Sequence, residues 1–453
     1  MTERLVALAL ANVLMLALGA GLLPFLRLAG TRRELLARLP LAYAVGIAAT
    51  GILAAHLALV GIPLGRILLP LLAVGSLALG LRRLRVADAP PHGRRRPDVE
   101  SLAAYVLLAV AAAFGVLAAR LLAAKPLVEF DGWAIWATRA RALYEFGDPA
   151  APVFTDPNYP ALQYPLLVPA LEAVGFRFMG GFDGTLIDLQ LLGLAVAFVG
   201  GAWSLLRERT RPLLLAAVLL AIVTAPTFTN QLQTNYADVP LAMLLALGLA
   251  ALAAWLADGD PGLLPAAALF LGAAALTKNE GEMFAVAAYV AAFAVARAGQ
   301  RRPLALAALA TLAIELPWRV WVQAKGVKIA DYSLANLFDP GYLWESRDRV
   351  GPAFEELLFQ LRIESSWSFL PWLVLFALVA AVMLRRGRLA LFAAAWFALS
   401  LAGLLAIYWI SRNPITDNLF NSSDRTTVTL MIGSALLVPV LLGVEREPEP
   451  GER

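Results

Sequence analysis

The chain of 453 residues contains no cysteine and only two histidines, His56 and His92. Without cysteine it can form no disulfide framework, thiol nucleophile or zinc–thiolate site. One histidine falls in an apolar stretch and the other in a basic segment, so neither a histidine metal cluster nor a histidine-based triad is expected. These absences leave carboxylates and cationic side chains as the groups that could carry chemistry.

Charge is also scarce, since charged residues make up 15% of the chain and hydrophobic residues 60%, with a mean hydropathy of +0.73. A soluble domain carries more charge and does not run repeatedly for about 20 residues without it. The sequence therefore predicts an all-α polytopic membrane protein with about 13 transmembrane helices. The expected spans are 4–27, 38–60, 64–82, 101–123, 184–206, 211–227, 238–257, 262–278, 281–298, 303–322, 367–385, 388–410 and 427–444.

Short arginine-rich connectors alternate with connectors that lack basic residues. The basic ones are TRRELLAR, LRRLR…HGRRR, RERTRP, RAGQRRP and RRGR. The positive-inside rule assigns them to the cytoplasm, which predicts an inner (plasma) membrane protein with its N-terminus outside and its C-terminal tail inside. The four lysines are then expected on the outer side, namely Lys125, Lys278, Lys325 and Lys328.

This topology predicts three regions: N-terminal membrane helices with a basic cytoplasmic linker (1–100), a main transmembrane unit (101–444), which the family resemblance described below identifies as catalytic, and a cytoplasmic tail (445–453). Three long loops of the main unit, 124–183, 323–366 and 411–426, fall on the same outer face. Such loops are where function concentrates. The segments ATRARALYEF and YPLLVPALEAVGFRFMG in the first loop predict short interfacial helices.

Two carboxylates, Glu129 and Asp131, open the first outer loop just beyond the span at 101–123. Ionised side chains are costly inside a bilayer, so an acidic pair kept at its edge indicates function. The carboxylates could act as a general base or, together with Asp238, hold a divalent cation such as Mg²⁺ or Mn²⁺. The alternative is that they cap a loop helix that begins near Gly132.

Other polar residues are expected at the same outer face. Asp238 begins a span, Lys278 and Glu280 occupy a break between two apolar stretches, and Arg412 and Arg425 flank the last outer loop. Asp238 could instead cap its helix, and Lys278 could extend to the membrane interface. Carboxylates and cations together suit a substrate with an anionic phosphate and a hydroxyl that must lose a proton.

Four segments in this order resemble motifs of the C-type polytopic glycosyltransferases (GT-C), in the branch of the protein O-mannosyltransferases and lipid A aminoarabinose transferases. They are Glu129-Phe130-Asp131, YPLLVPALEAVGFRFMGGFDGTLIDL, NYADVPLAMLLALGLA and LGAAALTKNEG. The resemblance covers about residues 101–444. It implies a GT-C core, a polyprenyl-phosphate-linked sugar donor, and inverting transfer on the periplasmic side. The acceptor would be an envelope lipid, glycan or protein; no nucleic acid is expected.

The resemblance also implies roles for individual residues. Asp131, supported by Glu129, would be the catalytic base, and Lys278, Arg425 and Arg412 would bind the donor phosphate. The acceptor or sugar contacts would be Asp238, Arg139, Arg141, Tyr159, Gln163, Tyr164 and Glu280. Arg139 and Arg141 could equally anchor their helix to lipid headgroups.

The chain departs from the family pattern in two places. About three spans precede the acidic loop, whereas the family usually has one. Lys278 is followed by Asn279 and Glu280 before the glycine. Two other functions stay open: a transporter or flippase of lipid-linked sugars, which usually needs charged groups at the midplane, and an envelope glycan polymerase or ligase, which usually places its largest loop late in the chain.

Overall fold

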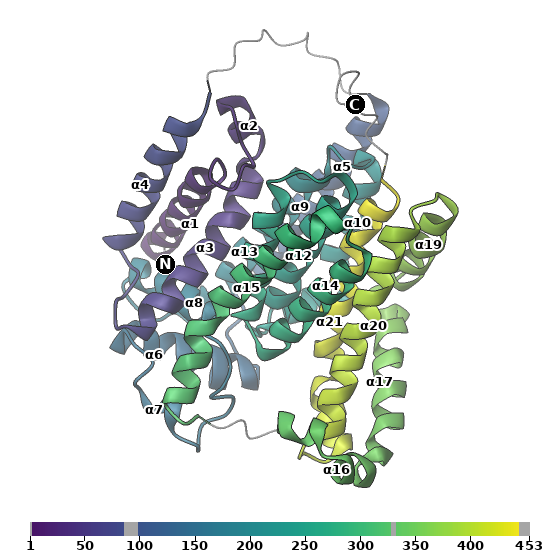
Figure 1. Ribbon diagram of the computed structural model, residues 1–453. Coiled ribbons are helices and arrows are strands. Elements are labelled where there is room, and N and C mark those ends of the chain that lie inside the picture. Colours follow the sequence, from purple (N-terminus) through teal and green to yellow (C-terminus); the bar gives the residue numbers. More distant parts are fainter. Residues whose placement is uncertain (1, 86–97, 328–331, 444–453) are drawn as a thin grey trace.

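The computed structural model describes residues 2–85, 98–327 and 332–443, and it is built from helices throughout these ranges (Figure 1). The all-α prediction is therefore confirmed for this part of the chain. The central part of the expected linker, with His92, the lysine at position 328 and the expected tail lie outside the described residues.

Eight helices within the described residues are long and apolar enough to cross a membrane. They are α1 (Thr2–Leu22), α3 (Leu39–Leu59), α5 (Val99–Leu122), α9 (Ile187–Leu206), α12 (Asp238–Asp258), α15 (Ala298–Ala324), α20 (Gly387–Ile410) and α21 (Ile415–Leu441). These helices indicate a membrane protein, because a span needs about 20 apolar residues.

The other expected spans fold as shorter helices. They are α4 (Leu68–Arg83), α10 (Pro212–Thr224), α13 (Leu263–Ala275), α14 (Asn279–Val295) and α19 (Leu370–Met383). Each expected span thus coincides with a helix, but a total of about 13 membrane crossings stays a prediction. A helix of 13 residues measures only about 20 Å, less than the thickness of the hydrocarbon core.

Short helices fill the outer loops and connectors. They are α2 (Arg32–Ala37), the π-helix η1 (Gly132–Ala137), α6 (Thr138–Phe146), α7 (Pro152–Thr155), α8 (Leu167–Met179), α11 (Pro226–Gln231), the 3₁₀ helix η2 (Leu334–Phe338), α16 (Pro340–Glu345), the 3₁₀ helix η3 (Arg347–Arg349), α17 (Val350–Arg362) and α18 (Glu364–Trp367).

Helix α12 lies at the centre of the bundle. Its apolar stretch is completely buried, and it packs against α21, α13, α9 and α14 (Figure 1). Helix α5, in contrast, is almost entirely exposed over its apolar stretch and packs mainly on α10. A helix that is apolar on all sides is expected either at a core or against lipid. Asp238 is the first residue of this central helix, and its side chain is buried.

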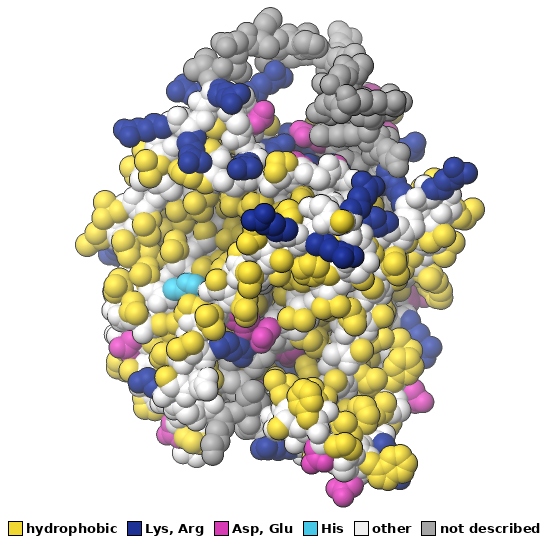
Figure 2. All heavy atoms as spheres, viewed as in Figure 1, with side chains coloured by type: hydrophobic (Ala, Val, Ile, Leu, Met, Phe, Trp, Pro, Cys, Tyr) yellow, Lys and Arg dark blue, Asp and Glu magenta, His cyan; other side chains and the backbone are white. Residues whose placement is uncertain are grey.

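Helices α3 and α4 both pack on α1 beside this core, and α8 packs against α1 and α3. Figure 2 shows a broad hydrophobic face across the middle of the molecule, with most arginine and lysine side chains gathered toward the end that carries α2. Within the described residues, the basic connectors therefore share one end, as the alternation of connectors predicts.

Two details of the expected loops are wrong. The third outer loop does not run to residue 426, because α21 already begins at Ile415 and continues the polar stretch as helix. The YPLLVP segment does form a helix, but all residues of α8 except Arg177 are buried. It is thus enclosed by protein and does not lie on a membrane surface.

Candidate functional site

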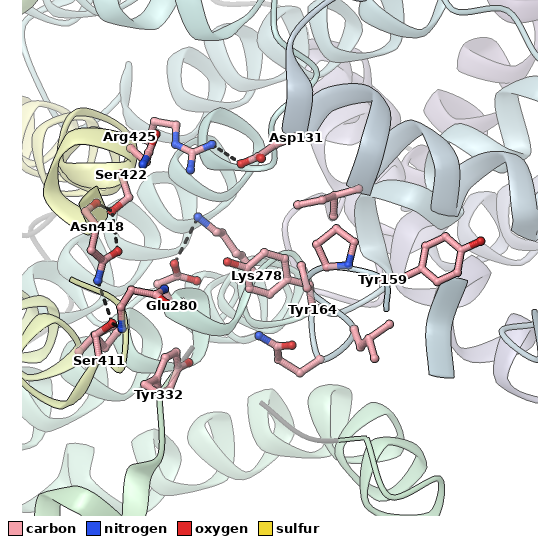
Figure 3. A pocket seen from close by; sticks show the side chains of 18 of the residues that line it. Asp131, Tyr159, Tyr164, Lys278, Glu280, Tyr332, Ser411, Asn418, Ser422 and Arg425 are labelled. Atoms are coloured by element: carbon pink, nitrogen blue, oxygen red, sulfur yellow. Dashed lines mark hydrogen bonds and ion pairs between the residues drawn. The ribbon is translucent and has the colours of Figure 1, made fainter. Parts of the chain in front are cut away.

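A cavity of about 870 Å³ lies where the first outer loop meets α12, the α13–α14 junction and the outer ends of α20 and α21. It has the size of a small-molecule site. Three carboxylates and two cations line it, namely Asp131, Asp238, Glu280, Lys278 and Arg425 (Figure 3).

Asp131 and Arg425 face each other across the cavity. Arg425 Nη1 donates a hydrogen bond of 2.5 Å to Asp131 Oδ2, although the two residues stand 294 positions apart. The guanidinium also lies 4.7 Å from the centre of the Tyr236 ring. Asp131 makes no side-chain cap to η1, which begins at the next residue, so the helix-cap interpretation of Asp131 is not supported by its contacts.

The second charged group is more deeply buried. Lys278 Nζ lies 2.8 Å from Asp238 Oδ1 and 3.2 Å from Glu280 Oε1, with side chains of Lys278 and Asp238 only 7% and 5% exposed. A lysine so enclosed by carboxylates does not extend to the membrane interface. Because its ammonium carries three donors, it can bridge both carboxylates and still meet a ligand.

Tyr164 lines the cavity next to Lys278. Its ring stacks on Trp136 at 5.5 Å between centroids, and Lys278 Nζ lies 5.7 Å from its centre. Burial raises the pKa of the Tyr164 phenol above its usual range, against the opposing effect of Lys278. The hydroxyl therefore stays protonated and can both donate and accept hydrogen bonds.

Two glycines explain how these segments approach so closely. A Cβ on Gly132, directly after Asp131, would lie 2.1 Å from the carbonyl oxygen of Thr234. A Cβ on Gly281, directly after Glu280, would lie 2.1 Å from the carbonyl oxygen of Ala274. Only glycine permits such contacts, and both glycines therefore fix the backbone beside a carboxylate of the cavity.

The α13–α14 junction is also held from its other side. Arg319 of α15 donates a hydrogen bond of 3.0 Å to Asn279 Oδ1, and it pairs with Glu282 and Glu315. Asn279 follows Lys278 directly. Arg319 is thus part of a charged network that supports the segment of Lys278.

The wall opposite the first loop is built from amides and hydroxyls. Asn418 Nδ2 donates to Ser411 Oγ at 3.0 Å, Ser422 Oγ donates to the carbonyl of Asn418 at 2.6 Å, and the Tyr408 hydroxyl lies 2.8 Å from Ser422 Oγ. Sequence reasoning missed these residues. Their spacing could have identified them, because positions 418, 422 and 425 lie on one face of a helix, although this segment was assigned to a loop.

Tyr159 and Gln163 also line the cavity, on the segment between α7 and α8. The structure thus brings together eight of the predicted site residues: Asp131, Tyr159, Gln163, Tyr164, Asp238, Lys278, Glu280 and Arg425. Trp318 of α15 supports this segment from behind by donating a hydrogen bond of 3.3 Å from Nε1 to the Gln163 carbonyl.

Four predicted site residues do not line the cavity. Glu129 pairs with Lys125 at 2.6 Å, and Arg141 pairs with Glu145 at the surface. Arg412 is exposed. Arg139 is completely buried, donates to the carbonyls of Ala161 and Leu162, and lies against the rings of Phe154 and Trp318. It therefore supports the segment from behind and cannot reach lipid headgroups.

The expected metal ligands do not converge on one point. Each of the three carboxylates has its own cationic partner: Lys125 for Glu129, Arg425 for Asp131 and Lys278 for Asp238. Across the described parts of the chain, no group of three or more histidine, aspartate or glutamate side chains is arranged to hold a metal ion. The geometry fits ion pairing rather than a cation held by these three residues.

No family model matches the chain, and neither a curated protein nor a solved structure matches it. The resemblance to C-type glycosyltransferases therefore rests on the four sequence motifs.

Proposed function

We propose that the chain is an inverting glycosyltransferase that moves a monosaccharide from a polyprenyl-phosphate donor to a hydroxyl group of an envelope lipid, glycan or protein. The observation that carries the proposal is the pairing of Asp131 with Arg425 beside the buried Lys278 group in one cavity. A transferase of this kind needs a base for the acceptor and cations for the leaving phosphate.

In this mechanism Arg425 and Lys278 bind the donor phosphate. Arg425 retains an unpartnered Nε atom, and Glu280 an unpartnered Oε2 atom, both buried. The incoming donor phosphate, a diester with one negative charge, competes with Asp131 for the guanidinium, and bidentate guanidinium–phosphate pairs are strong. Donor binding would thereby release Asp131 from its ion pair and make its carboxylate available as a base.

The bond changes then follow. Asp131 accepts the proton of the acceptor hydroxyl as that oxygen attacks the anomeric carbon from the face opposite the phosphate. The bond between the anomeric carbon and the phosphate oxygen breaks with its electron pair going to the phosphate, which leaves as polyprenyl phosphate. Attack from the opposite face inverts the configuration. Lys278 and Arg425 stabilise the charge that develops on the leaving oxygen.

The remaining cavity residues supply contacts of the kind that sugars require. Asn418, Ser422 and Tyr408 offer hydroxyl and amide groups on one side, and Tyr159, Gln163 and Tyr164 offer aromatic and amide groups on the other. Pockets of this type combine aromatic surfaces with a few polar groups that set orientation. Figure 3 shows the side chains of Asp131, Lys278, Glu280 and Arg425 close together in the cavity, where the phosphate of a lipid donor could meet both cations.

The proposal is tested with purified protein reconstituted in lipid nanodiscs, radiolabelled polyprenyl-phosphate sugars and a membrane extract as the source of acceptor. We expect label to move from the lipid to an acceptor, and Arg425→Gln to abolish the transfer. The matched control is Arg347→Gln, which removes an exposed arginine that bonds only to the nearby Trp344 carbonyl. Label that stays on its lipid for every donor, while proteoliposomes translocate that lipid, would establish a transporter instead.

A further inference from the structure

Two buried carboxylates lie outside the cavity and have no partner that explains them. Glu172 of α8 is 2% exposed and Asp188 of α9 is 0% exposed. None of their four carboxylate oxygens makes a hydrogen bond to any described residue. Buried charges in proteins are normally paired or bound to a metal ion, and an unsatisfied buried group calls for a specific explanation.

The two carboxylates act on each other. Glu172 and Asp188 lie on helices that pack together, and the pKa of Glu172 is raised well above its usual value by burial first and by the charge of Asp188 second. Asn235 lies beside the Glu172 carboxyl and opposes this rise. Its own amide oxygen and nitrogen are buried and make no hydrogen bond of normal geometry.

The charged groups nearest to this cluster do not neutralise it. Asp188 interacts electrostatically with Glu129 and Lys125 at the start of the first outer loop. Lys125, however, already pairs with Glu129 at 2.6 Å and donates to the Gln233 carbonyl at 3.3 Å. The Lys125–Glu129 pair has no net charge, so it does not offset the negative charge that Glu172 and Asp188 carry when both are ionised.

We propose that Glu172, Asp188 and Asn235 bind a divalent cation of the hard class, Ca²⁺ or Mg²⁺. Two carboxylates balance the charge of such an ion, and an amide oxygen with water molecules completes a coordination shell of oxygen atoms. The site takes only two acidic residues, which is fewer than the three or more that define an acidic metal cluster. It is distinct from the cavity, because none of its three residues lines it.

The cation would hold three segments of the chain in register. Glu172 belongs to α8 and Asp188 to α9, while Asn235 adopts a left-handed backbone conformation (φ 55°) just before Tyr236 and Asp238. Asp238 in turn pairs with Lys278 in the cavity. The ion would therefore act as a structural support behind the cavity and take no part in the chemistry there.

The test uses the purified full-length protein in nanodiscs after treatment with a chelator, with no sugar donor present. Ca²⁺ or Mg²⁺ is added at constant ionic strength, with NaCl as the reference, and the melting temperature and the bound metal are measured. At a hundredfold excess over Kd we expect Tm to rise by about 3–5 °C, with about one ion bound per chain. Asp188→Asn and Asn235→Ala should weaken or abolish both effects, whereas Glu345→Gln, at an exposed residue of α16, should keep them.

A wild-type protein that binds no divalent ion and melts at the same temperature with and without it overturns the proposal. If, in addition, Glu172→Gln melts higher than the wild type at neutral pH, a proton shared by the two carboxyl groups takes the place of the ion. If Asp188→Asn fails to fold, the metal content and the melting shift of the wild type and of Asn235→Ala still test whether the site binds a divalent cation. The readouts involve no transfer of sugar, so their failure leaves the proposed transferase untouched.

Discussion

Replacing Asp131 with asparagine should separate catalysis from donor binding. Asparagine keeps the size of the side chain but cannot accept the proton of the acceptor hydroxyl. A positioned general base contributes about 10²–10⁴-fold to a rate, so kcat should fall by that factor, equivalent to about 3–5 kcal/mol in the barrier. The Michaelis constant for the donor should stay the same or decrease, because Arg425 no longer has a carboxylate that competes with the phosphate.

The stability cost of this substitution follows from the exposure of the ion pair. The side chains of Asp131 and Arg425 are 27% and 18% exposed, so the pair lies between the surface and the interior. Exposed pairs contribute about 0–1 kcal/mol and breaking buried ones costs about 3–5 kcal/mol. We expect a loss of about 1–2 kcal/mol, which leaves a folded protein whose kinetics can be measured.

The assay is single-turnover transfer of radiolabelled sugar at several donor concentrations, with Glu345→Gln as the matched control at an exposed carboxylate. Arg425→Gln should show the opposite pattern, with a large rise in the donor Michaelis constant. An Asp131→Asn variant whose kcat stays within threefold of the wild type would refute Asp131 as the base. A loss confined to donor affinity would refute the competition between Asp131 and phosphate for Arg425.

Three further perturbations test the site and its support. Lys278→Met should destabilise the protein by about 3–5 kcal/mol, because it leaves Asp238 and Glu280 buried without a cation. Lys125→Met breaks a pair whose side chains are 28% and 23% exposed and should cost only about 1–2 kcal/mol, and thermal unfolding compares the two variants. Gly132→Ala should reduce transfer strongly, since its Cβ meets the Thr234 carbonyl, whereas Gly115→Ala, which meets no atom within 4 Å, should leave the rate unchanged. In chelator-treated protein, stability should fall as the pH rises above the ordinary pKa of a glutamate, because the raised pKa of Glu172 makes the folded state bind more protons than the unfolded state there. Glu172→Gln should flatten this dependence, and a flat profile for the wild type would contradict the assignment.

Hydropathy and charge predicted the helices because their signals are local. Each expected span coincides with a helix, and the arginine-rich connectors gather at one end as the positive-inside rule requires. The start of α21 was misplaced for a physical reason: the polar stretch from Asp417 to Arg425 has the composition of a loop, yet its polar side chains form one wall of the cavity. Tertiary contact outweighed local composition there.

The site was partly predictable. Asp131, Asp238, Lys278 and Glu280 were found because charge at the end of an apolar helix needs an explanation. The partners in each ion pair could not be predicted, since the contact between Asp131 and Arg425 depends on how segments distant in the sequence pack together. For the same reason Arg139 was assigned to the site although it lies buried behind it, and the importance of Glu172 and Asp188 was missed because burial cannot be read from an isolated acidic residue.

The long separation of Asp131 and Arg425 along the chain has a consequence for biosynthesis. The first of these residues leaves the ribosome with the early helices, whereas the second belongs to α21, near the C-terminal end of the described residues. Half of the charged pair is thus missing until the last long helix has been made and inserted. A nascent chain would hold Asp131 without Arg425, the cation that we propose binds phosphate, so we expect the proposed transfer activity to begin only once α21 is in place.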